Sequence, residues 1–275
     1  MKNTTTTLRS VAADPPDRVL TEPDEQTAGY NAFPLSYSQE RLWIVHELDP
    51  DSPAYNAGAA LELAGVLDLS LLRRALSEIT RRHEVLRTTL HHVGDDLVQI
   101  ISDECQCELP VEDVEHGSDS EGSERVVKMA RKFVKTPFDL KSGPLLRTRL
   151  FRLDQQHHVL VLAVHHIVSD AWSIGIFLGE LETLYAAFAA GKRSPLPEPA
   201  LQYADYAVWE REWLQGEVIE EHLDYWRKQL TDLPAMLALP TDYPRPKRQR
   251  FEGSHHAIHF GREFTEQLRR FGQPR

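Results

Sequence analysis

Two adjacent histidines, His165 and His166, follow directly on a run of apolar residues. The run, residues 159 to 164, contains only valine, leucine and alanine, which is typical of a strand buried on both faces of a sheet. Imidazole is the side chain best suited to moving protons near neutral pH, and α/β proteins place their chemistry at the carboxyl ends of such strands. The two histidines therefore predict an acid–base site, and Asp170 lies only a few residues downstream.

A helix is predicted to begin directly after this polar turn. Ser169 and Asp170 are residue types that commonly cap a helix, and the apolar residues after them keep a 3.6-residue spacing over four turns. These apolar residues are Ile174, Phe177, Leu178, Leu181, Leu184, Tyr185 and Phe188. The strand, the turn and the helix together would hold the two imidazoles in place.

The same residues also allow other interpretations. An isolated histidine at the end of a strand is more often a structural residue than a catalytic one. By side-chain type, His165, His166 and Asp170 are also possible metal ligands, although the sequence indicates no further ligand. Other parts of the chain have to decide between these interpretations.

Residues 165–171, HHIVSDA, resemble the HHxxxDG signature of the condensation domains of nonribosomal peptide synthetases, which are grouped with chloramphenicol acetyltransferase. Five companion motifs resemble other motifs of this family and follow its order along the chain. They are LSYSQERLW at 35–43, RHEVLRTTL at 82–90, PFDLKSGPLLR at 137–147, YADYAVWE at 203–210 and LPTDYPRP at 239–246. The resemblance covers roughly residues 33 to 253.

The resemblance implies an α/β (α+β) fold, with a chloramphenicol acetyltransferase-like lobe whose mixed sheet is flanked by helices, and then the truncated start of a second lobe. Condensation domains are V-shaped pairs of such lobes, with the histidine motif facing a tunnel, and they are considerably longer than this chain. We expect a disordered leader over residues 1–30, the N-terminal lobe over 31–192, and a linker with the truncated start of the C-terminal lobe over 193–275. The polar leader and the three prolines within residues 191–199 independently favour these boundaries.

The resemblance also implies roles for individual residues. His166, the second histidine of the motif, would meet the attacking nucleophile, and His165 would be structural. Asp170 would hold the histidine loop in shape by pairing with an arginine, for which Arg87 is preferred over Arg147. Removing one partner of such a buried pair would cost about 3–5 kcal/mol.

Two further positions are expected to support the site. Ser173 is expected in the core of the lobe or in the tunnel. Ala171 stands where the family has glycine, so a left-handed backbone there would cost roughly 1–2 kcal/mol, and the methyl group would narrow the space beside His166. The other residues expected in the core or the tunnel are Trp172, Tyr203, Asp205 and Trp209.

The function implied by the resemblance is that of an acyltransferase that forms an amide bond. A carrier-bound acyl or peptidyl thioester would be the donor, and a carrier-bound aminoacyl group would be the acceptor. The partners would be carrier proteins and neighbouring synthetase domains, the substrates would ride on phosphopantetheine, and the domain itself would need no cofactor or metal. Two alternatives remain open: a truncated or degenerate module that only docks carrier proteins, and a standalone CoA-dependent acyltransferase.

The composition is that of a globular protein and argues against several classes of partner. The chain has 275 residues, of which 41% are hydrophobic, and its net charge of −11 argues against a nucleic-acid partner. No run approaches the roughly 20 apolar residues of a membrane helix, so we expect no membrane partner and a cytoplasmic location. Cys105 and Cys107 are too close together for an ordinary disulfide and are expected to be reduced thiols.

The remaining elements are predicted from capping residues and spacing. Ser36, with Gln39 three residues later, predicts a capping box and a helix that ends before Pro50, and Asp68 is expected to cap a second helix. Residues 112–124 are acidic and rich in glycine and serine, which favours a solvated loop. Strands are predicted at 57–63, 85–90, 97–101, 146–153, 157–164 and 255–260, and further helices from 126 to near 137, at 203–214 and at 217–230.

Overall fold

The computed structural model describes residues 31–104, 106–114, 119–234, 236–246, 253 and 256–272. The leader predicted over residues 1–30 and the side chain of Cys105 lie outside these described residues. Contacts divide the chain into two compact units, one that ends at Thr231 and one that begins at Asp232. No helix within the described ranges is long and apolar enough to cross a lipid bilayer.

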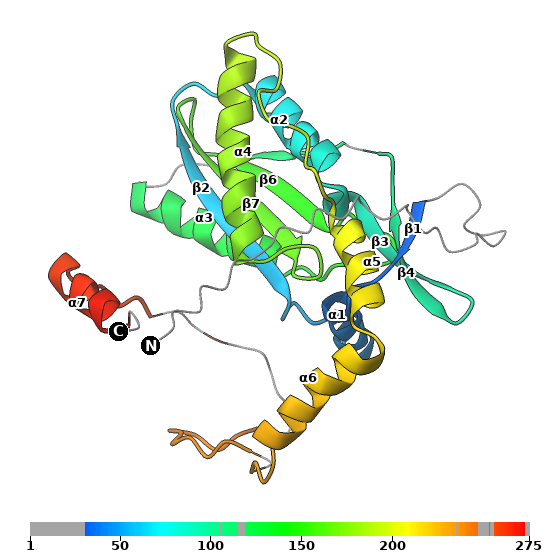
Figure 1. Ribbon diagram of the computed structural model, residues 1–275. Helices are drawn as coiled ribbons and strands as arrows, with labels where there is room; N and C mark the ends of the chain where they lie inside the picture. The colour runs from blue at the N-terminus through cyan, green and yellow to red at the C-terminus, as the bar shows by residue number, and fades with distance from the viewer. Residues whose placement is uncertain are drawn as a thin grey trace, which may run out of the picture. The chain divides into compact units, whose positions relative to one another are not determined.

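A four-stranded sheet contains the strand β7, which ends at His165 (Figure 1). Its strands lie in the order β2 (Asn56–Ala64), β7 (His157–His165), β6 (Leu146–Arg152) and β5 (Val111–Asp113). β7 runs antiparallel to both of its neighbours, and β5 runs parallel to β6. The strands predicted at 57–63, 146–153 and 157–164 are therefore confirmed, and residues 160–164 of the apolar run in β7 are buried.

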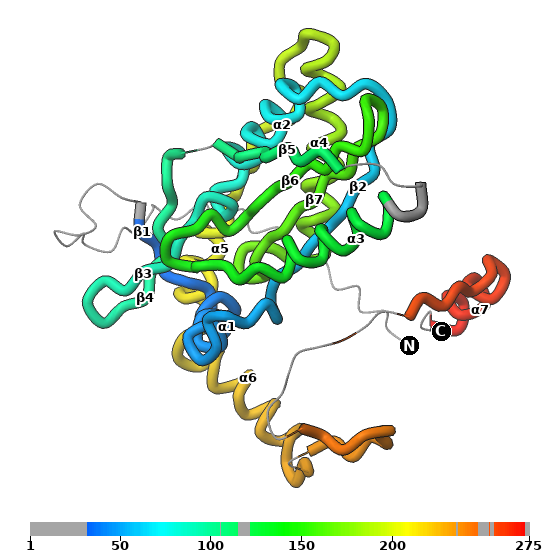
Figure 2. The backbone as a smooth tube through the Cα atoms, turned by 180° about the vertical axis from the view of Figure 1, so that it is seen from behind, coloured from blue at the N-terminus to red at the C-terminus, as the bar shows by residue number. Residues whose placement is uncertain are grey.

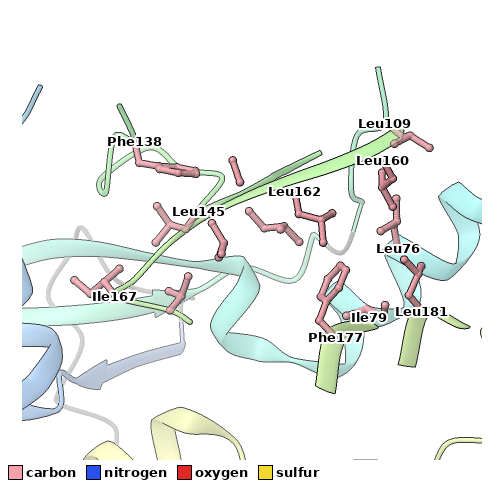
Figure 3. Close-up of a cluster of buried hydrophobic side chains, with 14 of the residues drawn as sticks. Leu76, Ile79, Leu109, Phe138, Leu145, Leu160, Leu162, Ile167, Phe177 and Leu181 are labelled. Carbon is pink, nitrogen blue, oxygen red and sulfur yellow. The ribbon is translucent and has the colours of Figure 1, made fainter. Parts of the chain in front are cut away.

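Helices cover both faces of this sheet (Figures 1 and 2). α2 (Leu69–Arg82), capped by Asp68, and α4 (Ala171–Ala189) share one face, and α3 (Asp119–Val134) packs against β2 and β7 on the other. In the main core, Leu160 and Leu162 of β7 belong to the same buried cluster as Phe177 and Leu181 of α4 (Figure 3). This core fixes the start of α4 relative to the end of β7, which is where the histidines lie.

A second sheet has the strand order β1 (Asn31–Pro34), β4 (Asp96–Ile101) and β3 (Thr88–Val93). β3 and β4 pair as an antiparallel hairpin, and Gly94 in its turn has a φ of 59°, which glycine adopts without steric cost. α1 (Tyr37–Leu48) follows β1, and the predicted capping box between Ser36 and Gln39 is present. The helix predicted after Ser36 and the strand predicted at 97–101 are therefore present, whereas no strand was predicted at the position of β1.

The first compact unit continues beyond the proline-rich stretch at residues 191–199. α5 (Tyr203–Trp213) packs on β1, where Ala204 and Val208 join a small buried cluster. α6 (Gly216–Gln229) follows before the division at Thr231. The two predicted helices are present, and the compact unit extends past residue 192, where the sequence places the end of the first lobe.

Residues 112–124 do not form the single loop that their acidic composition predicts. Part of this stretch is β5, whose Glu112 pairs with Arg149 of β6 at 3.1 Å and whose Asp113 pairs with Arg152. α3 then begins at Asp119, where the helix dipole favours acidic residues. Arginines on a neighbouring strand are distant in the sequence, so local composition gives no sign of this pairing.

One strand prediction begins too early, and another is wrong. Glu84–Arg87 form a short 3-10 helix, η1, so that β3 begins only at Thr88. Residues 256–260 form no strand, and α7 (Arg262–Gly272) follows them in the second unit. A strand needs a neighbour for its backbone hydrogen bonds, and none of the described strands pairs with 256–260.

Candidate functional site

The two histidines lie in a tight turn between β7 and α4. β7 ends at His165, and Asp170 caps the start of α4. The His166 N–H donates to the Tyr55 carbonyl at 2.8 Å, and the Val168 N–H donates to the His165 carbonyl at 3.1 Å. Backbone hydrogen bonds therefore fix the turn on both sides of His166.

The His165 ring is buried, with only 3% of the residue exposed. Its Nδ1 accepts a hydrogen bond from the Ile167 N–H at 3.1 Å, and the rings of His46, Tyr55 and Phe138 surround it. Burial, and then the charges of two neighbouring histidines, lower the pKa of His165 to about 4. The ring is therefore neutral near pH 7, with its proton on Nε2, and these contacts favour a structural role.

The His166 side chain is exposed on the same turn. His166 is the first residue after β7, so its side chain lies in the turn and not between the covered faces of the sheet. The pKa of the nearby Asp170 is lowered, first by the hydrogen bond from the Ser173 N–H and in smaller part by the charge of His166. An exposed imidazole close to a carboxylate is suited to accept a proton from an incoming nucleophile.

Asp170 does not form the predicted ion pair with Arg87. Its Oδ1 accepts from the Ser173 N–H at 2.8 Å, and the Ser173 Oγ accepts from the Asp170 N–H at 2.8 Å, which makes a capping box at an exposed position. Arg87 instead donates to the Ser102 carbonyl and lies 3.5 Å from Glu84. The prediction is wrong because the helix N-terminus satisfies the carboxylate locally.

Arg147 does not pair with Asp170 either, but it contacts the residues around the buried histidine. Its guanidinium donates to the carbonyls of Thr136 and Pro137, and its Cζ lies 3.8 Å from the centroid of the Phe138 ring. Phe138 is buried and stands edge-on to the His165 ring, with the centroids 6.0 Å apart. Arg147 therefore holds residues 136–138 in place, and Phe138 of this segment packs against one side of the His165 ring.

The sequence reasoning missed an ion pair that anchors α4. Arg82 of α2, whose side chain is only 4% exposed, lies 3.1 Å from the Glu180 carboxylate of α4, and the His83 Nε2 lies 2.9 Å from the same carboxylate. Arg82 and His83, at the start of the motif at 82–90, were the sign in the sequence that this region could bind a carboxylate. Nothing in the spacing around Glu180 marks it as the partner, because the contact depends on how α2 and α4 pack.

Ala171 does not carry the strain that a left-handed backbone would impose. It is the first residue of α4, and the only non-glycine residue with a positive φ in the described part of the chain is Asp232. Alanine is a good helix former, so the predicted cost at this position is absent. Trp172 lies outside the core, with 80% of the residue exposed, and Trp209 is 47% exposed.

The described residues give no support to a metal site. None of them form a group of three or more histidine, cysteine, aspartate or glutamate side chains that could hold a metal ion. In the histidine turn, the Nδ1 of His165 is already occupied by the Ile167 N–H. Cys107 is a free thiol, and burial raises its pKa.

Comparison with known sequences gives one family for nearly the whole chain. A family model described as Condensation domain matches residues 30–275. Chondramide synthase cmdD of Chondromyces crocatus is 41% identical over 243 residues, which is 88% of this chain and 6% of that protein. Phosphinothricin tripeptide synthetase PhsC of Streptomyces viridochromogenes is 37% identical over 263 residues, which is 95% of this chain and 24% of that protein.

Solved structures show the same fold. The X-domain from teicoplanin biosynthesis superposes with a TM-score of 0.69 at 29% identity, over 83% of this chain and 48% of that one. The SgcC5 protein from Streptomyces globisporus has a TM-score of 0.64 at 35% identity, over 77% of this chain and 49% of that one. The predicted mixed α/β lobe is confirmed, and the chain spans about half the length of these structures.

Proposed function

We propose that this chain, which belongs to the condensation domain family, supplies the proton-accepting histidine of an amide-forming site. One observation carries the proposal: His166 is exposed on a turn whose backbone is fixed, while the adjacent His165 is buried and neutral. A base must be accessible to the nucleophile and held in a defined direction. His166 meets both requirements, so we assign the reacting imidazole to it and a structural role to His165.

The reaction would transfer an acyl or peptidyl group from sulfur to nitrogen. The amine nitrogen of an aminoacyl acceptor attacks the carbonyl carbon of a thioester donor, so that the C–N bond forms and the C–S bond breaks. The nitrogen gives up one proton, which His166 accepts and passes to the departing sulfur. Positioned acid–base catalysis of this kind contributes about 10²- to 10⁴-fold, and the alignment of two tethered substrates contributes further.

The substrates would arrive on the phosphopantetheine arms of carrier proteins, and the domain would bind no cofactor of its own. The relatives support this assignment, because they are much longer synthases and synthetases of which the matched region is a minor part. Carrier proteins and neighbouring synthetase domains are therefore the proposed partners. The exposed His166 and the open surface at Trp172 leave the turn accessible to them.

A second candidate function is a module that docks another protein without catalysing condensation. The X-domain from teicoplanin biosynthesis, 29% identical to this chain, has been solved in complex with OxyB. That observation shows that a protein of this fold can serve as a binding partner. The two candidates differ in whether His166 is required for a chemical step.

The distinguishing experiment is His166→Ala in a complete condensation domain that carries these residues, supplied with loaded donor and acceptor carriers. We expect product formation to fall at least about 100-fold while the circular dichroism spectrum is unchanged, because the side chain is exposed. His157→Ala is the matched control, since His157 is an exposed histidine at the opposite end of β7. Equal product from His166→Ala and the unaltered domain would refute the catalytic role and favour docking.

A further inference from the structure

Gln39, in the first turn of α1, is a buried amide with two hydrogen-bond partners. Only 1% of the residue is exposed. Its Oε1 accepts from the Ser36 N–H at 3.0 Å and completes the capping box of α1. Its Nε2 donates to the Ile167 carbonyl at 3.5 Å. One side chain therefore links the start of α1 to the histidine turn, although the two segments are far apart in the sequence.

The partners of Gln39 fix the orientation of its amide group. The Ser36 N–H is a donor and requires the amide oxygen, and the Ile167 carbonyl is an acceptor and requires the amide nitrogen. Glutamate would complete the capping box equally well and would be favoured by the helix dipole, but an ionised carboxylate has no proton for the carbonyl. Glutamine thus provides one donor beyond what helix capping requires, and this donor points at the histidine turn.

Ile167 makes two hydrogen bonds that hold the histidine turn. Its N–H donates to the Nδ1 of His165 at 3.1 Å, its carbonyl accepts from Gln39, and it is 3% exposed. We infer that Gln39 is a positioning residue, because it fixes the backbone immediately after His166 and thereby the direction of the exposed imidazole. The inference rests on the proposed role of His166 as the proton acceptor.

Hydrogen bonds from α5 fix the start of α1, so the position of Gln39 is itself fixed. Glu210 of α5, which is 8% exposed, accepts from the Tyr37 N–H at 2.8 Å. The adjacent Arg211 donates from Nε to the Leu35 carbonyl at 2.7 Å. α5 therefore holds the first turn of α1, and Gln39 connects that turn to the residue after His166.

The test is hydrogen exchange in this chain, measured by NMR as the exchange rate of the Ile167 N–H divided by that of Leu162 in the centre of β7. Gln39→Met keeps the length of the side chain and removes both hydrogen bonds, and we expect the ratio to rise about tenfold. Gln39→Glu keeps the bond to the Ser36 N–H and should raise the ratio similarly at pH 7. Leu162 reports global unfolding, so a merely destabilised variant would raise the exchange rate of Leu162 at least as much as that of Ile167 and would not raise the ratio.

Ser36→Ala is the control, because it removes the hydroxyl that accepts from the Gln39 N–H at 3.2 Å but leaves the amide of Gln39 in place. We expect its ratio to stay within twofold of the unaltered chain. An unchanged ratio in both Gln39 variants, or a tenfold rise in Ser36→Ala as well, would overturn the inference.

Kinetics in a complete condensation domain separate this inference from the proposed function. Gln39→Met should lower kcat about tenfold with KM within twofold, since it misdirects His166 and leaves the carrier surfaces intact. If His166→Ala abolishes product formation and Gln39→Met leaves kcat unchanged, the positioning role is refuted and the proposed function stands. If His166→Ala retains full activity, the proposed function fails, and the exchange ratio alone decides whether Gln39 holds the turn.

Discussion

Protonation of His165 should destabilise the fold over a defined pH range. Burial lowers its pKa to about 4, whereas an unfolded chain would have the ordinary histidine value of about 6.5. The unfolded state therefore binds the proton first as the pH falls. The stabilisation is fully present above pH 6.5 and is lost progressively between pH 6.5 and pH 4.

The magnitude follows from the difference between the two pKa values. A difference of about 2.5 units corresponds to roughly 3 kcal/mol of unfolding free energy, of which about 2 kcal/mol is lost by pH 5. The main cause is the burial of the ring, which disfavours its charged form, and a protonated Nδ1 also cannot accept the hydrogen bond from the Ile167 N–H. We expect urea denaturation, followed by circular dichroism, to show this loss between pH 7 and pH 5.

His165→Asn isolates this contribution from that of other titrating groups. The asparagine Oδ1 lies as many bonds from Cα as Nδ1 does, so it can accept from the Ile167 N–H but does not titrate. The variant has lower stability at every pH because the ring is lost, but its loss between pH 7 and pH 5 should be about 2 kcal/mol smaller than that of the unaltered chain. His46, whose pKa is also lowered by burial, is present in both proteins. Equal losses in the two proteins would refute the reasoning.

Two further predictions concern the supports of α4, and both use urea denaturation. Asp170→Ala should lower the free energy of unfolding by only about 1 kcal/mol, the value for a lost N-cap, because the carboxylate is exposed and bonded to Ser173. A decrease of about 3–5 kcal/mol would instead indicate a buried arginine partner. Glu180→Ala should lower the free energy of unfolding by about 3–5 kcal/mol, because it leaves Arg82 buried without its carboxylate. Glu182 is exposed on the same helix, and Glu182→Ala should lower the free energy of unfolding by less than about 0.5 kcal/mol. Similar costs for the two glutamates would contradict the importance of the Arg82 pair.

The parts of the fold that depend on local signals could be predicted from the sequence. The capping box of Ser36 and Gln39, the cap at Asp68 and the hairpin at Gly94 each involve residues within a few positions of one another. The buried strand β7 was also predictable, because its apolar run needs no knowledge of its neighbours. Local chemistry therefore gave the order of elements that leads to the histidine turn.

Two of the contacts that the sequence did not reveal join distant segments. β5 depends on arginines of β6, and the pairing of Arg82 with Glu180 depends on how α2 packs on α4. Asp170 shows the opposite error, since a distant arginine was expected where Ser173, three residues away, satisfies the carboxylate. The resemblance to a family gave a reason to expect that pair, but which partner lies within reach depends on the three-dimensional packing.

The histidine pair combines two demands that a single residue could not meet. A proton acceptor must be exposed to its substrate, yet an exposed turn without internal contacts would leave the imidazole without a fixed direction. Because the strand ends between the two residues, the dipeptide buries His165 as a neutral acceptor for the Ile167 N–H and exposes His166 in the turn. The same arrangement should make the position of His166 depend on pH. Protonation of the buried His165 ring would remove the hydrogen bond from the Ile167 N–H, which holds the turn that carries His166.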